Sequence, residues 1–243
     1  MTPQTRSRRV RSAPPRLVTF ALVIWCGFSG SLHASQRVSF RTDDGVILAA
    51  TWYEPAGRTG PAVILVHMLH RTRRDFDGLA SRLASEGIGA LALDLRGHGE
   101  SGGMVGADFT PMAADVRAAR HFLATRGYVS GRIGVLGASL GANVAALEAG
   151  DDAAVASLVL LSPSLDYRGL RIETAMRKYA ARPLLMVASD DDPYAMRSAR
   201  DIQKGGKSRE ILSLTGAGHG TVMLERDASL MGSLVDWFRR TLL

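Results

Sequence analysis

The sequence predicts an α/β fold: a mostly parallel sheet of eight strands that begins with an antiparallel hairpin and carries helices on both faces. Three observations predict it. Short apolar runs of strand type recur along the chain. Segments of helical composition separate them, and strands that alternate with helices form parallel sheets buried on both sides. The first two runs, in contrast, are joined by a tight turn at Asp43, Asp44 and Gly45.

The elements are expected in the following order. The hairpin pairs residues 37–40 with residues 46–53 across the Asp-Asp-Gly turn. Apolar runs that end at polar or turn residues predict the later strands at 62–66, 89–93, 133–136, 155–161, 183–188 and 210–214. Helices are expected near 76–85, across 111–125, after residue 141, near 172–180 and 194–202, and at the end of the chain.

The first 35 residues differ from the rest in charge and hydropathy. Residues 17–28 contain no charge, and five arginines precede them: Arg6, Arg8, Arg9, Arg11 and Arg16. A basic head, a short apolar centre and a run of small residues form the layout of a secretory signal peptide. Cleavage is expected after Ala34 or Ser31. The alternative is an uncleaved membrane anchor, although a spanning helix needs about 20 apolar residues.

Residues 36–243 are expected to form one exported domain, periplasmic or secreted. Without the five arginines, the chain carries 25 basic and 23 acidic residues, so its charge gives no indication of nucleic-acid binding. Cys26 is the only cysteine and lies in the apolar stretch, so this domain has no disulfide. Its stability must come from a hydrophobic core, which about 208 residues can supply.

Gly137-Ala138-Ser139-Leu140-Gly141 lies between an apolar run of strand type and a helical segment rich in alanine. A serine between two glycines at such a corner is the nucleophile-elbow pattern. The turn forces strained dihedrals on Ser139, and the two glycines remove side chains that would collide with it. The hydroxyl then lies exposed at the start of the next helix, with the Leu140 N–H beside it as a donor to an oxyanion.

A serine hydroxyl becomes a nucleophile when a base removes its proton and an acid orients that base. Folds that use this elbow supply the partners in the chain order serine, acid, histidine. His219 is the only histidine that follows Ser139, because His33, His67, His70, His98 and His121 all precede it. Its position between glycines suits a mobile loop. We therefore expect His219 to be the general base.

Three consecutive aspartates follow the predicted strand 183–188: Asp190, Asp191 and Asp192. The segment between them and His219 is long enough for one helix and one strand. Aspartates at the end of a strand are often solvated or cap helices. Asp192 precedes Pro193, which biases its backbone to an extended conformation that can direct the carboxylate back toward the sheet. We expect Asp192 to be the orienting acid, with Asp191 as the runner-up.

Three ordered motifs resemble the α/β-hydrolase superfamily: Val63-Ile64-Leu65-Val66-His67, the loop from Asp94 to Gly102, and the elbow around Ser139. The likeness is greatest to its compact dienelactone-hydrolase-like and serine-aminopeptidase-like (acylglycerol-lipase-like) members. It implies a second oxyanion donor two places after His67, at Leu69. Met68 stands where the family usually has glycine, which narrows the backbone dihedrals and leaves open whether Met68 or Leu69 donates.

The resemblance also sets expectations for the surroundings of the site. Only 21 residues separate Leu161 from Pro183, too few for the large helical cap of many relatives. We therefore expect an open pocket, lined by Met68, Leu69, Leu140 and residues near Leu165 and Tyr167. His98 and His67 are interpreted as structural, and the run from Arg71 to Arg74 as a solvated surface. No metal-binding or phosphate-loop motif occurs in the sequence.

Together these residues predict an exported serine hydrolase that cleaves a carboxylic ester of a small-molecule acyl substrate through an acyl-enzyme. The alternatives are a serine peptidase or acyltransferase with the same residues, a hydrolase of lactones or carbon–carbon bonds, and a non-catalytic envelope binding protein, which Met68 favours. We expect no cofactor, no metal ion and no nucleic-acid partner. Membrane contact is expected only through residues 17–28, if the signal is not cleaved.

Overall fold

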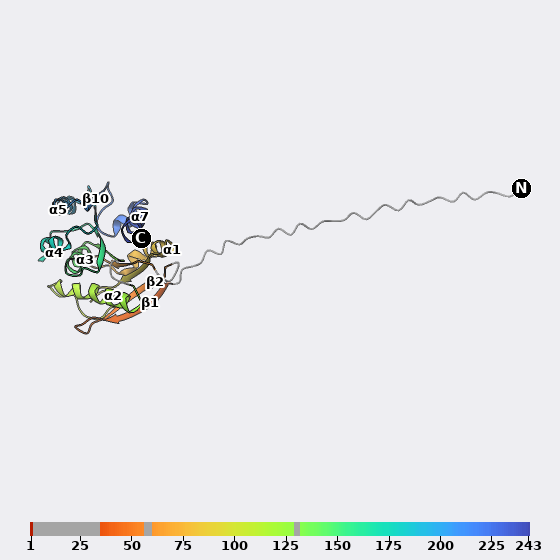
Figure 1. Cartoon of the computed structure of the whole chain (residues 1–243), viewed down its shortest axis with the longest axis horizontal. Coiled ribbons are helices and arrows are strands. Elements are labelled where there is room, and N and C mark those ends of the chain that lie inside the picture. The colour runs from red at the N-terminus through yellow and green to blue at the C-terminus, as the bar shows by residue number, and fades with distance from the viewer. Residues whose placement is uncertain (2–34, 56–59, 129–131) are drawn as a thin grey trace. The chain divides into compact units, whose positions relative to one another are not determined.

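A computed structural model describes residue 1 and residues 35–55, 60–128 and 132–243 (Figure 1). The predicted signal peptide or anchor, with its apolar centre at 17–28, lies outside the described residues. Within the described residues, no helix combines the length and apolar character needed to cross a membrane.

The main sheet has eight strands, the number that the sequence predicts, and their order is β1-β2-β4-β3-β5-β6-β9-β10. β2 pairs antiparallel with both β1 and β4, and the remaining neighbours pair in parallel. The hairpin turn is closed by bonds between Thr42 and Val46 and between Gly45 and Thr42. The strand bounds are β1 Ser35–Arg41, β2 Ile47–Tyr53, β3 Ala62–Val66, β4 Gly89–Leu93, β5 Ile133–Ala138, β6 Val155–Leu161, β9 Leu184–Ser189 and β10 Arg209–Leu214.

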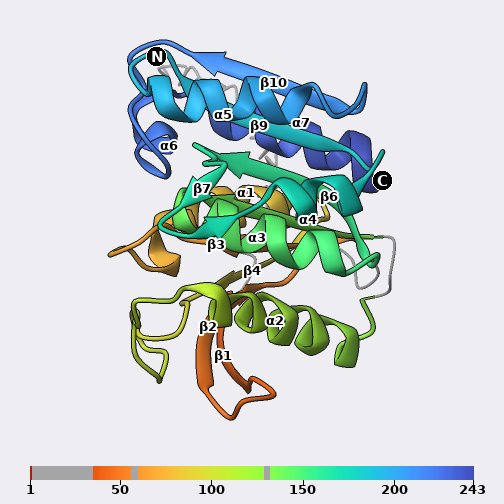
Figure 2. The same cartoon turned by 90° about the vertical axis from the view of Figure 1, so that its left-hand side faces the viewer.

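Helices cover both faces of the sheet, and Figure 2 shows α2, α3, α4 and α5 in front of it. Alternate strand residues supply the two cores: Ile64 and Val66 pack on the face of these four helices, whereas Val63 and Leu65 pack on the face of α1, α6 and α7. The helix bounds are α1 Asp77–Ser85, α2 Ala113–Thr125, α3 Leu140–Asp151, α4 Glu173–Tyr179, α5 Pro193–Gln203, α6 Val222–Arg226 and α7 Leu230–Leu242.

Several short elements were not expected from the sequence. Single 3-10 turns, Arg73–Phe76 and Thr110–Met112, lead into α1 and α2. Between β6 and α4, the strands β7 (Asp166–Tyr167) and β8 (Leu170–Arg171) form a small separate hairpin, and α6 follows the loop of His219. These segments are too short to show a hydrophobic period. The hairpin and α4 fill the interval between β6 and β9, so no large cap domain is present there.

The loops after β3, β5, β9 and β10 carry the residues singled out in the sequence. The carboxyl ends of parallel strands meet at one edge of a sheet, which is where α/β folds place their ligands. Met68 and Leu69 follow β3, Ser139 follows β5, Asp192 follows β9 and His219 follows β10. The fold therefore brings segments from four parts of the chain to the same edge.

Candidate active site

Ser139 occupies the sharp corner between β5 and α3. Its φ is 51° and its ψ is −114°, a strained conformation for a residue with a side chain. A Cβ on Gly137 would lie 2.1 Å from the carbonyl oxygen of Gly141, and a Cβ on Gly141 would lie 2.4 Å from that of Val66. Only glycine fits at either position, so the two glycines of the motif make the corner possible.

The imidazole of His219 lies between Ser139 and Asp192. Its Nε2 is 2.7 Å from Ser139 Oγ, and its Nδ1 is 2.6 Å from Asp192 Oδ2. A carboxylate accepts a proton, so Nδ1–H donates to Asp192 and Nε2 is left to accept the hydroxyl proton. The His219 side chain is 49% exposed, whereas that of Asp192 is 13% exposed. The geometry can therefore pass a proton from hydroxyl to imidazole. Ser139 itself is buried, with 6% of its surface exposed, so its hydroxyl is less exposed than the sequence predicts.

The three consecutive aspartates have different partners. Asp190 Oδ1 accepts from Gly216 N at 2.8 Å, and Asp191 Oδ1 accepts from Gly218 N at 3.0 Å. Asp192 alone contacts the imidazole, and its other carboxylate oxygen caps α5 by accepting from Ala195 N at 3.2 Å. Asp192 is thus the carboxylate that the fold places on His219.

The backbone of the loop that carries His219 is bonded to side-chain oxygens of residues at the ends of neighbouring strands. Besides Asp190 and Asp191, Ser189 Oγ accepts from Ala217 N and Ser162 Oγ accepts from Gly220 N, each at 2.9 Å. Ser162 itself has a positive φ of 51° and lies directly after β6. Four backbone N–H groups of the loop that the glycines predict to be mobile are therefore bonded to side-chain oxygens. Sequence reasoning missed Ser162 and Ser189, because a serine at the end of a strand gives no distinctive signal.

The loop after β3 is fixed by the buried His67. His67 Nδ1 is 2.8 Å from the carbonyl oxygen of Met68, and His67 Nε2 accepts from Leu95 N at 3.0 Å. The tautomer is therefore Nδ1–H, donating to the Met68 carbonyl. In a trans peptide the C=O and N–H point in opposite directions, so this bond also fixes the direction of the Leu69 N–H. Whether Leu69 or Met68 is the second oxyanion donor stays a prediction.

The side chain of Leu140 does not line an open pocket, which differs from the prediction, whereas Met68 is partly buried. Leu140 is fully buried in the core, so it offers the site only its backbone N–H. Met68 packs against the core on the α1 and α7 face, and its sulfur occupies the space where a side chain on Gly220 would begin, 2.5 Å from that Cβ position. Leu69, Leu165 and Tyr167 remain partly buried on the opposite core.

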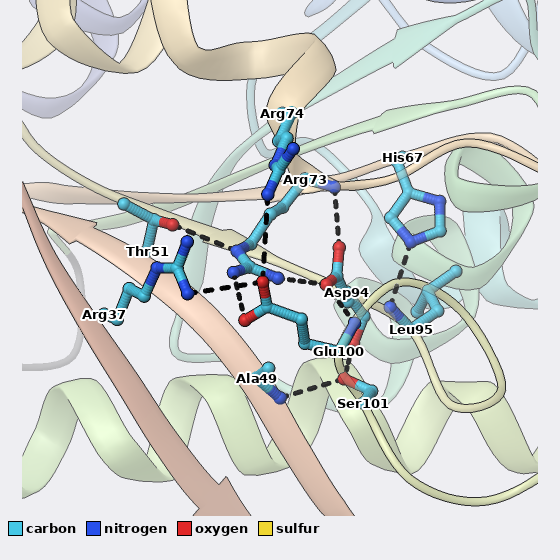
Figure 3. Close-up of polar contacts among 10 residues, drawn as sticks. All are labelled: Arg37, Ala49, Thr51, His67, Arg73, Arg74, Asp94, Leu95, Glu100 and Ser101. Carbon is cyan, nitrogen blue, oxygen red and sulfur yellow. Dashed lines mark hydrogen bonds and ion pairs between the residues drawn. The ribbon is translucent and has the colours of Figure 1, made fainter.

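Arg73 is buried, which corrects the prediction of a solvated surface from Arg71 to Arg74 (Figure 3). It forms a buried ion pair with Asp94, and its other guanidinium nitrogens donate to Thr51 and Glu100. Asp94 also accepts from the backbone N–H groups of Arg73 and Glu100 at 2.8 and 2.9 Å. The burial of Arg73 follows no local sequence pattern, because its partner Asp94 lies 21 residues later in the chain, directly after β4.

His98 packs edge-on against His67, with ring centroids 5.0 Å apart, and Nδ1 of His98 lies 3.0 Å from the carbonyl oxygen of Arg96. Burial lowers the pKa of His67 to about 4, so this ring is neutral at ordinary pH. Within the part of the chain that the structure describes, no three metal-ligating side chains gather at one point.

The sheet order, the elbow at Ser139 and the compact helical layers define a hydrolase of the α/β-hydrolase fold. The chain belongs to the serine aminopeptidase S33 family, whose model matches residues 57–204. An uncharacterized protein of Mycobacterium tuberculosis is 31% identical over 226 residues, which cover 81% of this chain and 79% of that protein. The resemblance stated from the sequence motifs is confirmed.

Solved structures share this fold at lower sequence identity. The esterase Pf2001 of Pyrococcus furiosus is 18% identical with a TM-score of 0.71, and the match covers 87% of this chain and 94% of that one. A dienelactone hydrolase of Anabaena variabilis is 19% identical with a TM-score of 0.72, covering 86% of this chain and 99% of that one. Sequence identities this low show that the fold is shared, but they do not indicate which substrate this protein binds.

Proposed function

We propose that this protein is an exported serine hydrolase that cleaves carboxylic esters through Ser139, His219 and Asp192. The observation that carries the proposal is the unbroken chain of contacts from hydroxyl to imidazole to carboxylate, at 2.7 and 2.6 Å. A serine on a strained corner beside a half-exposed imidazole is the arrangement that nucleophilic acyl transfer needs. No other group of described side chains offers a nucleophile, a base and an orienting acid in one line.

The reaction begins when His219 Nε2 takes the hydroxyl proton as Ser139 Oγ attacks the acyl carbonyl. The backbone N–H groups of Leu140 and Leu69 stabilise the negative charge that develops on the carbonyl oxygen. Asp192 stabilises the imidazolium and keeps Nδ1 protonated. His219 then gives its proton to the leaving alcohol, and an acyl-enzyme remains on Ser139.

Water completes the cycle by the same steps. His219 removes a proton from the water as its oxygen attacks the acyl-enzyme carbonyl, and the second tetrahedral intermediate uses the same two N–H donors. Collapse of that intermediate releases the carboxylic acid, and the proton returns from His219 to Ser139 Oγ. No cofactor enters the scheme, and the substrate is a small-molecule acyl compound.

Three further observations support the finer parts of the proposal. Two esterases, from Pyrococcus furiosus and Exiguobacterium antarcticum, are among the solved structures that share the fold. Another such structure, DcsB, is complexed with its substrate analogue. The basic head and apolar centre of residues 1–35 support export, with retention as an anchor as the alternative.

The test combines a covalent probe with a screen of esters. A fluorophosphonate should label the wild-type protein, and a library of short-chain chromogenic esters should show turnover. Ser139→Ala should abolish both. The exposed Ser85 at the end of α1 offers a matched control, because Ser85→Ala removes a hydroxyl far from the site. A Ser139→Ala variant with wild-type turnover would reject the proposal, and absence of labelling would favour a non-catalytic binding protein.

A second candidate is a serine peptidase with the same residues, which the name of the matching family favours. An aminopeptidase must recognise a free amino terminus, and amides demand closer protonation of the leaving group than esters. Assays of peptides with free and blocked amino termini, with product analysis in the presence of alcohol acceptors, separate peptidase, acyltransferase and esterase activity.

A further inference from the structure

The loop of the proposed oxyanion donor and the loop of the proposed base meet on one carboxylate oxygen. Asp75 Oδ2 accepts from Thr221 Oγ1 at 2.5 Å and from Arg71 Nε at 2.8 Å. Thr221 lies two residues after His219, and Arg71 lies two residues after Leu69. The same oxygen therefore connects both halves of the site, although Asp75 and Thr221 are 146 residues apart in the chain.

Burial makes this junction more than a surface contact. Thr221 is fully buried and the carboxylate of Asp75 is largely buried. The sulfur of Met68 lies 3.5 Å from Thr221 Oγ1 and fills the space beside Gly220. The bond to Asp75 also raises the pKa of the Arg71 guanidinium. A buried hydroxyl that loses its carboxylate partner is left poorly satisfied, which is costly.

We propose that Asp75 and Thr221 are positioning residues that set the distance between the base His219 and the oxyanion donor Leu69. Neither residue contacts the substrate. The inference rests on the proposed function, and it extends that function to residues outside the Ser–His–Asp line. It also gives Met68 a role: the methionine that replaces the usual glycine packs the space between the two loops.

The bond between Thr221 and Asp75 is expected to affect the rate through the geometry of the site rather than through the stability of the fold. The base must lie within hydrogen-bond reach of Ser139, while the donors must point at the oxygen of the transition state. A displacement of about 1 Å in such an arrangement lowers the rate by about 100-fold. Ser162, Ser189 and the aspartates hold the His219 loop to the sheet, whereas the bond from Thr221 to Asp75 ties it to the segment that follows Leu69.

The experiment compares variants at the junction on the ester that the wild-type protein turns over best. Thr221→Val keeps the shape of the side chain and removes the donor, and Thr221→Ser keeps the donor. Asp75→Asn removes the charge. The double variant Thr221→Val/Asp75→Asn completes a double-mutant cycle, which measures the coupling between the two residues. The control is Glu225→Gln, which removes the exposed second partner of Arg71, 3.3 Å away. All rates are divided by the fraction of sites that a fluorophosphonate titrates.

Thr221→Val should lower kcat roughly 10- to 100-fold with KM changed less than about threefold, because chemistry rather than binding is affected. Thr221→Ser should recover most of the rate, Glu225→Gln should match wild type, and the double variant should lose no more than the worse single variant. A kcat for Thr221→Val within about twofold of wild type would overturn the inference.

An equal loss in Thr221→Ser and Thr221→Val would also overturn it, because the hydroxyl would then be irrelevant. If Thr221→Val is poorly folded, Thr221→Ser and Asp75→Asn still decide the question through their rates per titrated site. Failure of the proposed function gives a different result: Ser139→Ala then retains turnover or the wild type is not labelled, whatever the junction variants do.

Discussion

His219 and His67 occupy neighbouring loops at the same edge of the sheet and have opposite surroundings. His219 is half exposed, with one nitrogen on Asp192 and the other on the hydroxyl of Ser139. His67 is fully buried, and both of its nitrogens are bonded to backbone groups. The first ring can exchange a proton with a ligand, whereas the second has no bonding capacity left.

The polar residues around the two histidines follow the same division. Asp192 orients a ring that faces solvent, while Asp94 accepts from Arg73 and two backbone N–H groups deep in the protein. Similar residue types therefore belong to the proposed catalytic site at one place and to the architecture at the other. The difference lies in burial and in the number of bonds already formed, and the predictions below test it in order of expected size.

The largest effect is expected from His219→Gln. Loss of the base should lower kcat roughly 10⁴- to 10⁶-fold, as for other serine hydrolases of this type. Because the side chain is half exposed, the melting temperature should change by no more than about 2 °C. Ester turnover and thermal unfolding measure the two quantities. His121→Gln, on the exposed face of α2, is the matched control, and a fully active His219→Gln would remove the distinction between the two rings.

Asp94→Asn should have the next largest effect, on stability rather than on chemistry. It places an NH₂ group or an uncharged oxygen against Arg73 and breaks a buried ion pair, which costs about 3–5 kcal/mol. Urea unfolding would measure this loss, and activity per titrated site should stay within a few-fold of wild type. An undiminished free energy of unfolding would mean that this cluster does not hold the fold.

A smaller effect is expected from His67, through pH. The unfolded chain takes up a proton near pH 6.5, whereas the folded protein resists it until about pH 4, so the free energy of unfolding falls as the pH is lowered between these values. The full loss is about 3 kcal/mol. His67→Gln keeps one hydrogen-bond donor and one acceptor but does not titrate. In this variant, the decrease of the free energy of unfolding between pH 6.5 and pH 4 that His67 causes should disappear. Urea unfolding at pH 7 and pH 4.5 measures it, and identical slopes would contradict the neutral buried ring.

The smallest effect is expected from the exposed pair of Lys178 and Asp151. Their side chains are 57% and 58% exposed, although the nitrogen and oxygen are only 2.7 Å apart. Exposed pairs contribute about 0–1 kcal/mol, so Lys178→Gln should change the free energy of unfolding by less than 1 kcal/mol. If Lys178→Gln loses as much stability as Asp94→Asn, the distance between the charges rather than their burial determines how much an ion pair contributes to the free energy of unfolding.

Much of the fold could be predicted from the sequence, because the strands of a covered parallel sheet are continuous apolar runs. Three strands, at 62–66, 89–93 and 155–161, match their predicted bounds. The small hairpin of β7 and β8 and the helix α6 could not be predicted, because segments of two to five residues carry no period. For the candidate site, the order of Ser139, Asp192 and His219 named the residues that the fold brings together, and their catalytic roles stay a prediction.

By itself the sequence determined the local conditions of this protein: which segments become strands, where only glycine fits beside Ser139, and which histidine follows it. Tertiary structure alone decided that Arg73 turns inward to Asp94 and that Asp75 meets Thr221. The reason is physical. Strand and turn preferences act over a few neighbouring residues, whereas these contacts join side chains that only the packed sheet brings within bonding distance.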